Sequence, residues 1–259
     1  MEHLISTGGS VARAMPATGA SGRTVSKPTS RRWGAVSSPD PSGVHRKDHD
    51  RRMGALELFD RLLGRYGRQD WWPAESDFEM MVGSILVQHT AWGNVSLSLD
   101  RLRAEDLLNP GAMAGVEPDR LQHLIRHSGF MKAKARALLG LSAWLVGRGT
   151  AGADVEASDD PGLRDQLISL PGIGPETADV IRLYAFDQKC FIWDTYARRL
   201  LGELGYDHLG DYEQARRHEE GFIDLDSFGL DDLCEFHGLI VAAGKEAGRQ
   251  GGWDFLLHE

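Results

Sequence analysis

Apolar residues recur at helical spacing through most of the chain after residue 52. Residues 77–92 are strongly apolar and predict a buried helix. In residues 53–67 one apolar stripe is formed by Leu56, Phe59, Leu62, Leu63 and Tyr66. Further helical patterns cover residues 119–129, 131–149, 180–186, 195–205 and 230–248. Strand signals are few, and no two of them make a convincing hairpin. We therefore predict an all-α fold with short loops and no fixed-period repeat.

Residues 1–52 have a different character. They are rich in Ser, Gly, Pro, Thr and Arg and show no sustained periodicity, so we predict a disordered basic tail. This segment contains nine Lys or Arg and four Asp or Glu, a net charge of +5, which leaves −14 for the rest of a chain whose total is −9. Three interpretations of the tail stay open: a solvated segment, the product of a mistaken start site, or a segment that binds DNA phosphates weakly through its charge.

Composition narrows the function classes only slightly. The chain has 259 residues, of which 41% are hydrophobic and 26% charged, as in an ordinary globular protein. The acidic balance argues mildly against a nucleic-acid partner, although a locally basic face or backbone amides can still bind DNA. No apolar run reaches a membrane span and no signal-peptide core is present, so we expect a cytoplasmic protein. Cys190 and Cys234 make no disulfide framework, and we expect both to be buried apolar residues.

The stretch "LPGIGPETAD", residues 170–179, carries the strongest motif. Leu170 and Ile173 can anchor a tight turn, while Gly172 and Gly174 permit positive φ and leave their amides exposed. Because a helix starts just after the turn, its N-terminal amides add to the same site, which suits one DNA phosphate. Between two helical patterns this is the helix-hairpin-helix signature, and a plain interhelical turn is the alternative.

Twenty residues after the second glycine, Asp194 opens another helical pattern in "FIWDTYARRL". Residues 170–200 together resemble the hairpin and catalytic-aspartate block of the endonuclease III superfamily of DNA glycosylases. The stretches "SILVQHTAWGNVSLSL" and "GFMKAKARAL" resemble two further helices of that superfamily, so the match runs from about residue 71 to residue 244. The resemblance implies two helical lobes, residues 76–189 with the hairpin and residues 53–75 plus 190–259, with the damaged base bound between them.

Asp194 is the expected catalytic residue. Its alternative role is a helix N-cap worth about 1 kcal/mol, and both roles can coexist. Cleavage of a glycosidic bond develops positive charge on the sugar, which a carboxylate can stabilise while it orients or deprotonates the attacking water. An alkylated purine is cationic and already a good leaving group, so little acid assistance is required.

Two departures from the superfamily pattern narrow the reaction. Bifunctional members have a lysine directly before the "TA" of the hairpin, where this chain has Glu176. An amine can attack C1′ and form a Schiff base, which a carboxylate cannot, so a monofunctional glycosylase without lyase activity is implied. An acid in the first helical turn, favoured by the helix dipole, is the plainer interpretation of Glu176. Typical members also end in four cysteines that bind a [4Fe–4S] cluster; this chain has no such run, and we expect no cluster and no metal.

Those departures also occur in the 3-methyladenine DNA glycosylase III subfamily, which this chain resembles in two further motifs. One is "WWP", residues 71–73, and the other is "FHGLIV", residues 236–241. The subfamily can carry a lysine after "FHG", where this chain has Leu239, which leaves the base preference open. The resemblance implies a base pocket that contains Trp71, Trp72, Pro73 and Trp92.

The expected DNA contacts lie outside the pocket. Gln88 matches the residue that fills the vacated stack in relatives, and an ordinary polar helix end is its alternative. Lys132 and Lys134 stand at a helix start and are expected to contact phosphates, unless they are simply solvated. Gly172, Ile173 and Gly174 complete the set.

The predicted function is hydrolysis of the N-glycosidic bond of alkylated purines in base excision repair, acting on double-stranded DNA that contains a damaged base. We expect a monomer associated with the nucleoid, with no membrane partner and no cofactor. Two other functions stay open: a glycosylase for a mispaired adenine or a deaminated base, and a helix-hairpin-helix protein that only binds damaged DNA.

Overall fold

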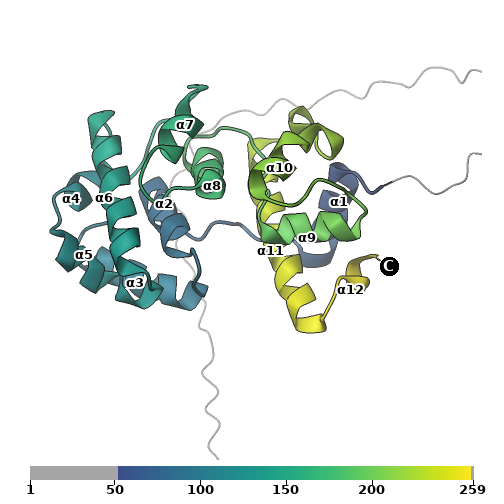
Figure 1. The fold of residues 1–259 in the computed structure, drawn as a ribbon, viewed down its shortest axis with the longest axis horizontal. Coiled ribbons are helices and arrows are strands. Elements are labelled where there is room, and N and C mark those ends of the chain that lie inside the picture. The colour runs from purple at the N-terminus through teal and green to yellow at the C-terminus, as the bar shows by residue number, and fades with distance from the viewer. Residues whose placement is uncertain (1–51, 258–259) are drawn as a thin grey trace, which may run out of the picture. The chain divides into compact units, whose positions relative to one another are not determined.

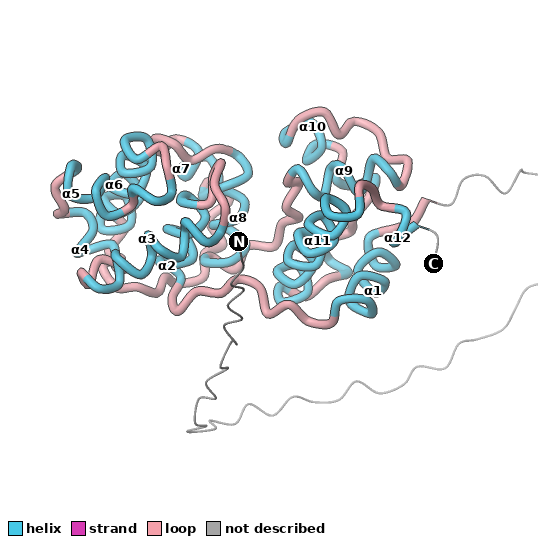
Figure 2. Tube along the Cα trace, turned by 90° about the horizontal axis from the view of Figure 1, so that it is seen from below, coloured by secondary structure: helices cyan, strands magenta, loops and turns pink. Residues whose placement is uncertain are grey.

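The computed structural model describes residues 52–257 (Figure 1). The predicted basic tail therefore lies outside the described residues, apart from Arg52. All regular structure between residues 52 and 257 is helical, and loops join the helices directly (Figure 2). The prediction of an all-α fold is confirmed.

One group of helices contains the hairpin. Its central helix α2 packs against α3, α6 and α8, while α6 also packs against α4 and α5, and α7 against α8. The group consists of α2 (Asp77–Leu86), α3 (Trp92–Ala104), α4 (Pro110–Ala114), α5 (Pro118–Leu124), the 3-10 turn η1 (Arg126–Ser128), α6 (Met131–Gly147), α7 (Leu163–Ile168) and α8 (Pro175–Ala185).

The remaining helices pack around the long helix α11, which contacts α1 and α9. This group consists of α1 (Ala55–Tyr66), α9 (Thr195–Glu203), α10 (Tyr212–Arg217), η2 (Glu219–Gly221), η3 (Leu225–Ser227), α11 (Leu230–Gln250) and α12 (Asp254–Leu257). Helix α8 of the first group contacts α10 and α11 of the second. The expected pair of lobes and its residue bounds stay a prediction.

The buried face of α1 differs from the predicted stripe. Ala55, Leu58, Phe59 and Leu62 are buried, at i, i+3, i+4 and i+7, whereas Leu56 is 51% exposed. The stripe prediction was wrong at Leu56 because it took one apolar residue at the edge of the face for part of the face. Leu58 belongs there instead.

The apolar stretch 77–92 is not one helix. Helix α2 is buried from Phe78 to Leu86, as predicted, and then the chain turns before α3 begins at Trp92. His89 has a φ of 55° in this turn, a left-handed conformation that no helix continues through. The break leaves Gln88 in the turn after α2 and makes Trp92 the first residue of α3.

Four short helices escaped the sequence patterns. Each has four to six residues, less than two turns, so an apolar period of 3.6 residues has no room to repeat. These helices are α4, α7, α10 and α12.

Candidate active site and nucleic-acid interface

The hairpin has the geometry expected of a phosphate-binding turn. Gly172 has a φ of 77° and is exposed, and a Cβ there would lie 3.0 Å from the Ala137 side chain, so this position requires glycine. Gly174 is the N-cap of α8 with an extended φ of −90°, and nothing lies within 4 Å of a Cβ built there. Only the first glycine therefore needs its conformational freedom. The second keeps the space in front of the helix open.

Backbone amides are free at this turn. No side chain caps α8, and the N–H groups of Gly172 and Gly174 have no hydrogen-bond partner among residues 52–257. Ile173 is buried and anchors the turn in the core, so only its backbone can face a ligand. Free amides at a helix start bind anions, and this arrangement can hold one phosphate.

Gln88 reaches the hairpin from the turn that follows α2. Its Nε2 donates to the Thr177 hydroxyl at 3.0 Å and lies 3.5 Å from the Gly172 carbonyl oxygen. The side chain is half-buried. The expected contact of Gln88 with DNA stays a prediction, and the structure adds that the residue is tied to the phosphate-binding turn.

Lys134 differs from its expected role. Its side chain is buried and its Nζ donates to the carbonyl oxygens of Leu86, Gln88 and Ser128 at 2.8, 2.8 and 2.6 Å. Burial lowers the pKa of this amine. All three ammonium hydrogens are donated to carbonyl groups within the protein. Lys134 therefore stabilises the end of α2 and cannot contact a phosphate. Lys132, two residues earlier in α6, is exposed, and its phosphate contact stays a prediction.

Asp194 is held firmly at the start of α9. The three residues before it, Phe191 to Trp193, are all buried, and its Oδ1 accepts a hydrogen bond from the Ala197 backbone N–H at 2.7 Å. The carboxyl is itself buried, at 7% exposure. Burial raises its pKa to about 7, and the nearby Glu176 carboxylate contributes in the same direction. Asp194 is thus an N-cap that holds α9 through Oδ1, while its second oxygen, Oδ2, lies 4.0 Å from His237 Nε2.

His237 faces that second oxygen and Tyr184 contacts His237 from behind, and the sequence motifs did not single them out for a role. His237 Nε2 lies 4.0 Å from Asp194 Oδ2, and its Nδ1 lies 2.9 Å from the Tyr184 hydroxyl. That hydroxyl donates to the Cys234 carbonyl oxygen at 2.9 Å. Since Tyr184 has one hydroxyl proton, Nδ1 of His237 is the donor to Tyr184, and Nε2 turns a lone pair toward Asp194. The "FHG" motif did contain the signal, because His237 is its second residue.

His237 does not form an ion pair with Asp194 at neutral pH. Its side chain is buried, and that burial lowers its pKa to about 4. His237 is therefore neutral beside a carboxyl whose pKa is about 7. Burial and the charge of Glu176, and not His237, raise the pKa of Asp194.

Glu176 sits in the first turn of α8, where the helix dipole would favour a carboxylate. Its pKa is nevertheless raised, because neighbouring protein desolvates the carboxyl, and Arg198 opposes this in part. Glu176 also raises the pKa of Asp194. Glu176 is thus a second acid that acts electrostatically on Asp194, and its place at the lyase-lysine position of bifunctional relatives stays a prediction.

An aromatic cluster contacts the imidazole of His237, which faces Asp194. Trp72 contacts Trp71, Trp92 and Tyr184 edge to face, with ring centroids 5.6, 5.5 and 5.9 Å apart. Tyr184 and Trp71 both contact the His237 ring in turn. The cluster therefore runs without a break from Trp92 to the imidazole that faces Asp194.

The contacts within this cluster limit where the predicted base pocket can lie. Trp72 and Trp92 touch each other edge to face, so no base fits between their rings. Pro73 is exposed, and Leu239, where a lysine was possible, is fully buried and does not reach the surface. A base can stack only on an outer face of the cluster or after a ring has moved. The assignment of Trp71, Trp72, Pro73 and Trp92 to a base pocket stays a prediction.

Two residues of α11 hold the "WWP" loop. Glu235 is buried and accepts hydrogen bonds from the backbone N–H groups of Gln69 and Asp70. A Cβ on Gly238 would lie 2.6 Å from the Trp71 Cβ, so the glycine of the "FHG" motif makes room for Trp71. The motif pair that suggested the subfamily is thus a packing contact between the loop and α11.

Phe130 stands out on the surface near Gln88. It is 67% exposed, has a φ of 46°, and caps α6. Its ring lies against His89, which also has a left-handed φ. A large exposed aromatic side chain at a fixed turn is suited to insert between bases, a role that the sequence motifs did not single out.

The cysteines do not fit an iron–sulfur cluster. A [4Fe–4S] cluster takes four thiolates, and the chain has two. Cys190 is buried, and its thiol donates to the Asp179 carbonyl oxygen at 3.3 Å. Among residues 52–257, no three His, Cys, Asp or Glu side chains gather as metal ligands. The absence of a cofactor stays a prediction that rests on the cysteine count. Over the same residues, no helix is long and apolar enough to cross a bilayer.

Comparisons with known proteins agree with this arrangement. A protein of Methanocaldococcus jannaschii named as a DNA repair glycosylase is 36% identical over 188 residues, covering 71% of this chain and 84% of the relative. The H. pylori 3-methyladenine DNA glycosylase bound to 1,N6-ethenoadenine superposes with a TM-score of 0.56 and 26% identity, over 76% of this chain and 95% of that chain.

A trapped endonuclease III–DNA covalent intermediate shares the fold, with a TM-score of 0.59, 22% identity and coverage of 74% of this chain and 84% of that chain. The model of the family described as HhH-GPD superfamily base excision DNA repair protein matches residues 82–223. That match spans Gln88, the hairpin and Asp194. The chain therefore belongs to the HhH-GPD superfamily of base excision DNA repair proteins, a superfamily of DNA glycosylases.

Proposed function

We propose that this chain is a monofunctional DNA glycosylase that hydrolyses the N-glycosidic bond of alkylated purines in double-stranded DNA. The observation that carries the proposal is the position of Asp194, whose Oδ2 lies 4.0 Å from His237 Nε2, and the His237 ring in turn contacts the aromatic cluster. A carboxylate for the sugar and aromatic faces for the base thus belong to one site.

The reaction follows from the free oxygen of Asp194. As the bond from C1′ to the base nitrogen breaks, its electron pair leaves with the base, and positive charge develops on the sugar beside Asp194. A cationic alkylated purine becomes neutral as it leaves, so the site needs no acid for the base. A water lying beside the gap between Asp194 Oδ2 and His237 Nε2 can donate one hydrogen to each and attack C1′. Its proton passes to the Asp194 carboxylate.

Glu176 supports the absence of lyase chemistry. A carboxylate cannot form the Schiff base through which an amine leads to strand cleavage. Lys134 cannot substitute for it, since its ammonium is buried in three hydrogen bonds. We propose that the product is an abasic site in an intact strand and that no iron–sulfur cluster takes part.

Aromatic stacking supports an alkylated purine as the base. A cationic base is attracted to aromatic faces by roughly 0.5–2 kcal/mol per contact, and Trp71, Trp72 and Trp92 adjoin the site. The likeness to an H. pylori protein that is named a 3-methyladenine DNA glycosylase supports the same class. The target base has to leave the duplex to reach these rings.

The hairpin supplies the grip on the DNA backbone in this proposal. The free amides of Gly172 and Gly174 hold a phosphate, Lys132 adds a charge, and Gln88 and Phe130 enter the duplex where the base has left. We propose that the protein acts as a monomer on damaged double-stranded DNA in the cytoplasm, at the nucleoid.

Base release from methylated DNA tests the proposal. With enzyme in excess, the wild type should release 3-methyladenine, and the Asp194→Asn variant should lose at least two orders of magnitude in rate. Borohydride should trap no covalent adduct. Unchanged release by Asp194→Asn would refute the role of Asp194, and a strong adduct would refute the lyase argument. If the protein releases a base only from duplexes with a mispaired adenine or a deaminated base, it is a glycosylase for that lesion. If it binds the DNA but releases no base, it is a DNA-binding protein without glycosylase activity.

A further inference from the structure

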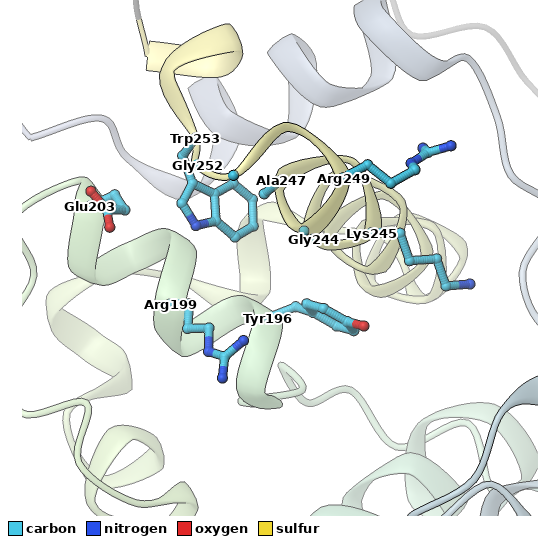
Figure 3. A pocket seen from close by; sticks show the side chains of 11 residues that line it. Tyr196, Arg199, Glu203, Gly244, Lys245, Ala247, Arg249, Gly252 and Trp253 are labelled. Carbon is cyan, nitrogen blue, oxygen red and sulfur yellow. The ribbon is translucent and has the colours of Figure 1, made fainter.

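A wide groove lies between α9 and α11, beyond the aromatic cluster. Its volume is about 860 Å³. Figure 3 shows Tyr196 and Arg199 projecting from α9, and Lys245 and Arg249 from α11. Neither Trp72 nor Trp92 lines it, so the groove is separate from the site described above.

The groove is cationic in a strongly acidic chain. Arg199, Lys245 and Arg249 are exposed, and among residues 52–257 no carboxylate lies within 4.0 Å of their charged groups. Glu246 of α11 does not line the groove; it accepts hydrogen bonds from Arg65 and Tyr66, and Arg249 also lowers its pKa. Glu203 lines the groove and is the single carboxylate that does. Three cations against one carboxylate give the lining a net positive charge.

The groove begins close to the reacting sugar. Asp194 caps α9, and Arg199 lies five residues further along, about 7.5 Å at 1.5 Å per residue. One DNA strand rises about 3.4 Å per nucleotide, so this step spans about two nucleotides. Lys245 provides a second link, because its Nζ lies 5.3 Å from the ring centroid of Trp71, a member of the aromatic cluster.

We propose that this groove binds the backbone phosphates of the damaged strand next to the extruded nucleotide, through Arg199, Lys245 and Arg249. The choice of strand rests on the proposed function, because Asp194 must face the sugar that is cleaved. The hairpin amides and the groove then hold the strand at two places, one by backbone N–H groups and one by cationic side chains.

Salt dependence of DNA binding tests the groove. The probe is a fluorescent duplex with a tetrahydrofuran abasic analogue, titrated with wild type and with a triple variant, Arg199→Ala, Lys245→Ala and Arg249→Ala. Each lost phosphate contact should reduce the slope of log K against log salt by about 1, so the triple variant should lose about 3, with a loss of affinity of about tenfold or more at low salt.

Three matched variants serve as controls. Arg120→Ala removes the same charge from exposed α5, outside the groove, and should leave the slope at the wild-type value. The Lys-for-Arg variants Arg199→Lys and Arg249→Lys keep the charge and should retain most of the slope. A triple variant with the wild-type slope and affinity overturns the proposal, as does an equal loss in Arg120→Ala.

The outcome is distinguishable from that of the proposed function. Release of methylated base by the wild type, together with an unchanged slope in the triple variant, refutes the groove alone. A reduced slope in a protein that releases no base supports the groove as a phosphate site and refutes the glycosylase reaction. A wild type that does not bind the duplex refutes both.

Discussion

Asp194 and His237 face each other across 4.0 Å without forming an ion pair at neutral pH. Burial lowers the histidine pKa to about 4 and raises the aspartate pKa to about 7, so the two charged forms hardly coexist at any pH. The site therefore holds a carboxyl that is half-protonated near physiological pH, beside a neutral imidazole. Its activity should depend on that one ionisation.

We expect kcat/KM for base release to rise with pH through a midpoint near 7, since the ionised carboxylate stabilises the sugar cation. Below about pH 6 the rate should fall about tenfold per pH unit. The measurement is single-turnover release from methylated DNA between pH 5 and 9. A flat profile over that range would contradict the ionised carboxylate as the active form.

The free energy of unfolding should depend on the same ionisation of Asp194, but it should fall as pH rises, whereas the rate of base release rises. The folded pKa of Asp194 is raised above that of the unfolded chain, so its contribution to stability is complete below about pH 4 and is lost as pH rises to about 7. The cost should amount to a few kcal/mol by the usual 1.36 kcal/mol per pKa unit. The Asp194→Asn variant keeps an N-cap residue and should not show this loss, which urea denaturation at pH 5 and pH 8 can test.

Removing the charge of Glu176 should lower the pKa of Asp194. In Glu176→Gln the like charge is gone, so the ascending limb of the pH profile should move to lower pH with little change at its plateau. The matched control is Asp165→Asn, an exposed carboxylate of α7, which should leave the midpoint in place. Movement to higher pH would show that Glu176 acts in another way.

Substitution of Lys134 should lower stability, whereas substitution of Lys132 should weaken DNA binding. Lys134→Met leaves the carbonyl groups of Leu86, Gln88 and Ser128 without their donor and should cost about 2–4 kcal/mol in urea denaturation. Lys132→Met should stay within about 0.5 kcal/mol of the wild type but reduce the salt slope of DNA binding by about 1. Equal stability of the two variants would refute the structural role of Lys134.

Phe130 should matter for duplexes and not for folding. Because the side chain is exposed, Phe130→Ala should leave stability within about 0.5 kcal/mol of the wild type. It should slow base release from a paired duplex by about tenfold, as unstacking costs a few kcal/mol per step. Release from a lesion in single-stranded DNA should change little, and Phe130→Leu should behave much like the wild type. An equal loss on both substrates would point to a different role.

Much of the fold could be predicted because its features are local. Helix periodicity gave the all-α class, and the spacing of Gly172 and Gly174 before a helix gave the hairpin. The position of Asp194 at a helix start also predicted a cap, which the Ala197 bond confirms. Each of these features depends on a few consecutive residues.

The rest depends on contacts between distant segments. Lys134 looks like a surface lysine until three carbonyl groups surround its amine, two of them more than 40 residues away. Tyr184 and His237 lie 53 residues apart and acquire a role only when α8 meets α11. The contact of Trp72 with Trp92 likewise follows from packing, so the sequence alone could suggest aromatic residues near the base but not the shape they enclose.

The cap made by Asp194 has a practical consequence. One oxygen of this carboxylate secures α9 while the other is left for chemistry, so asparagine can replace it with the helix start intact. The resulting protein should retain its grip on an extruded nucleotide and be unable to release the base. Such a form is a reagent for capturing lesions, able to mark damaged positions in isolated genomic DNA without erasing them.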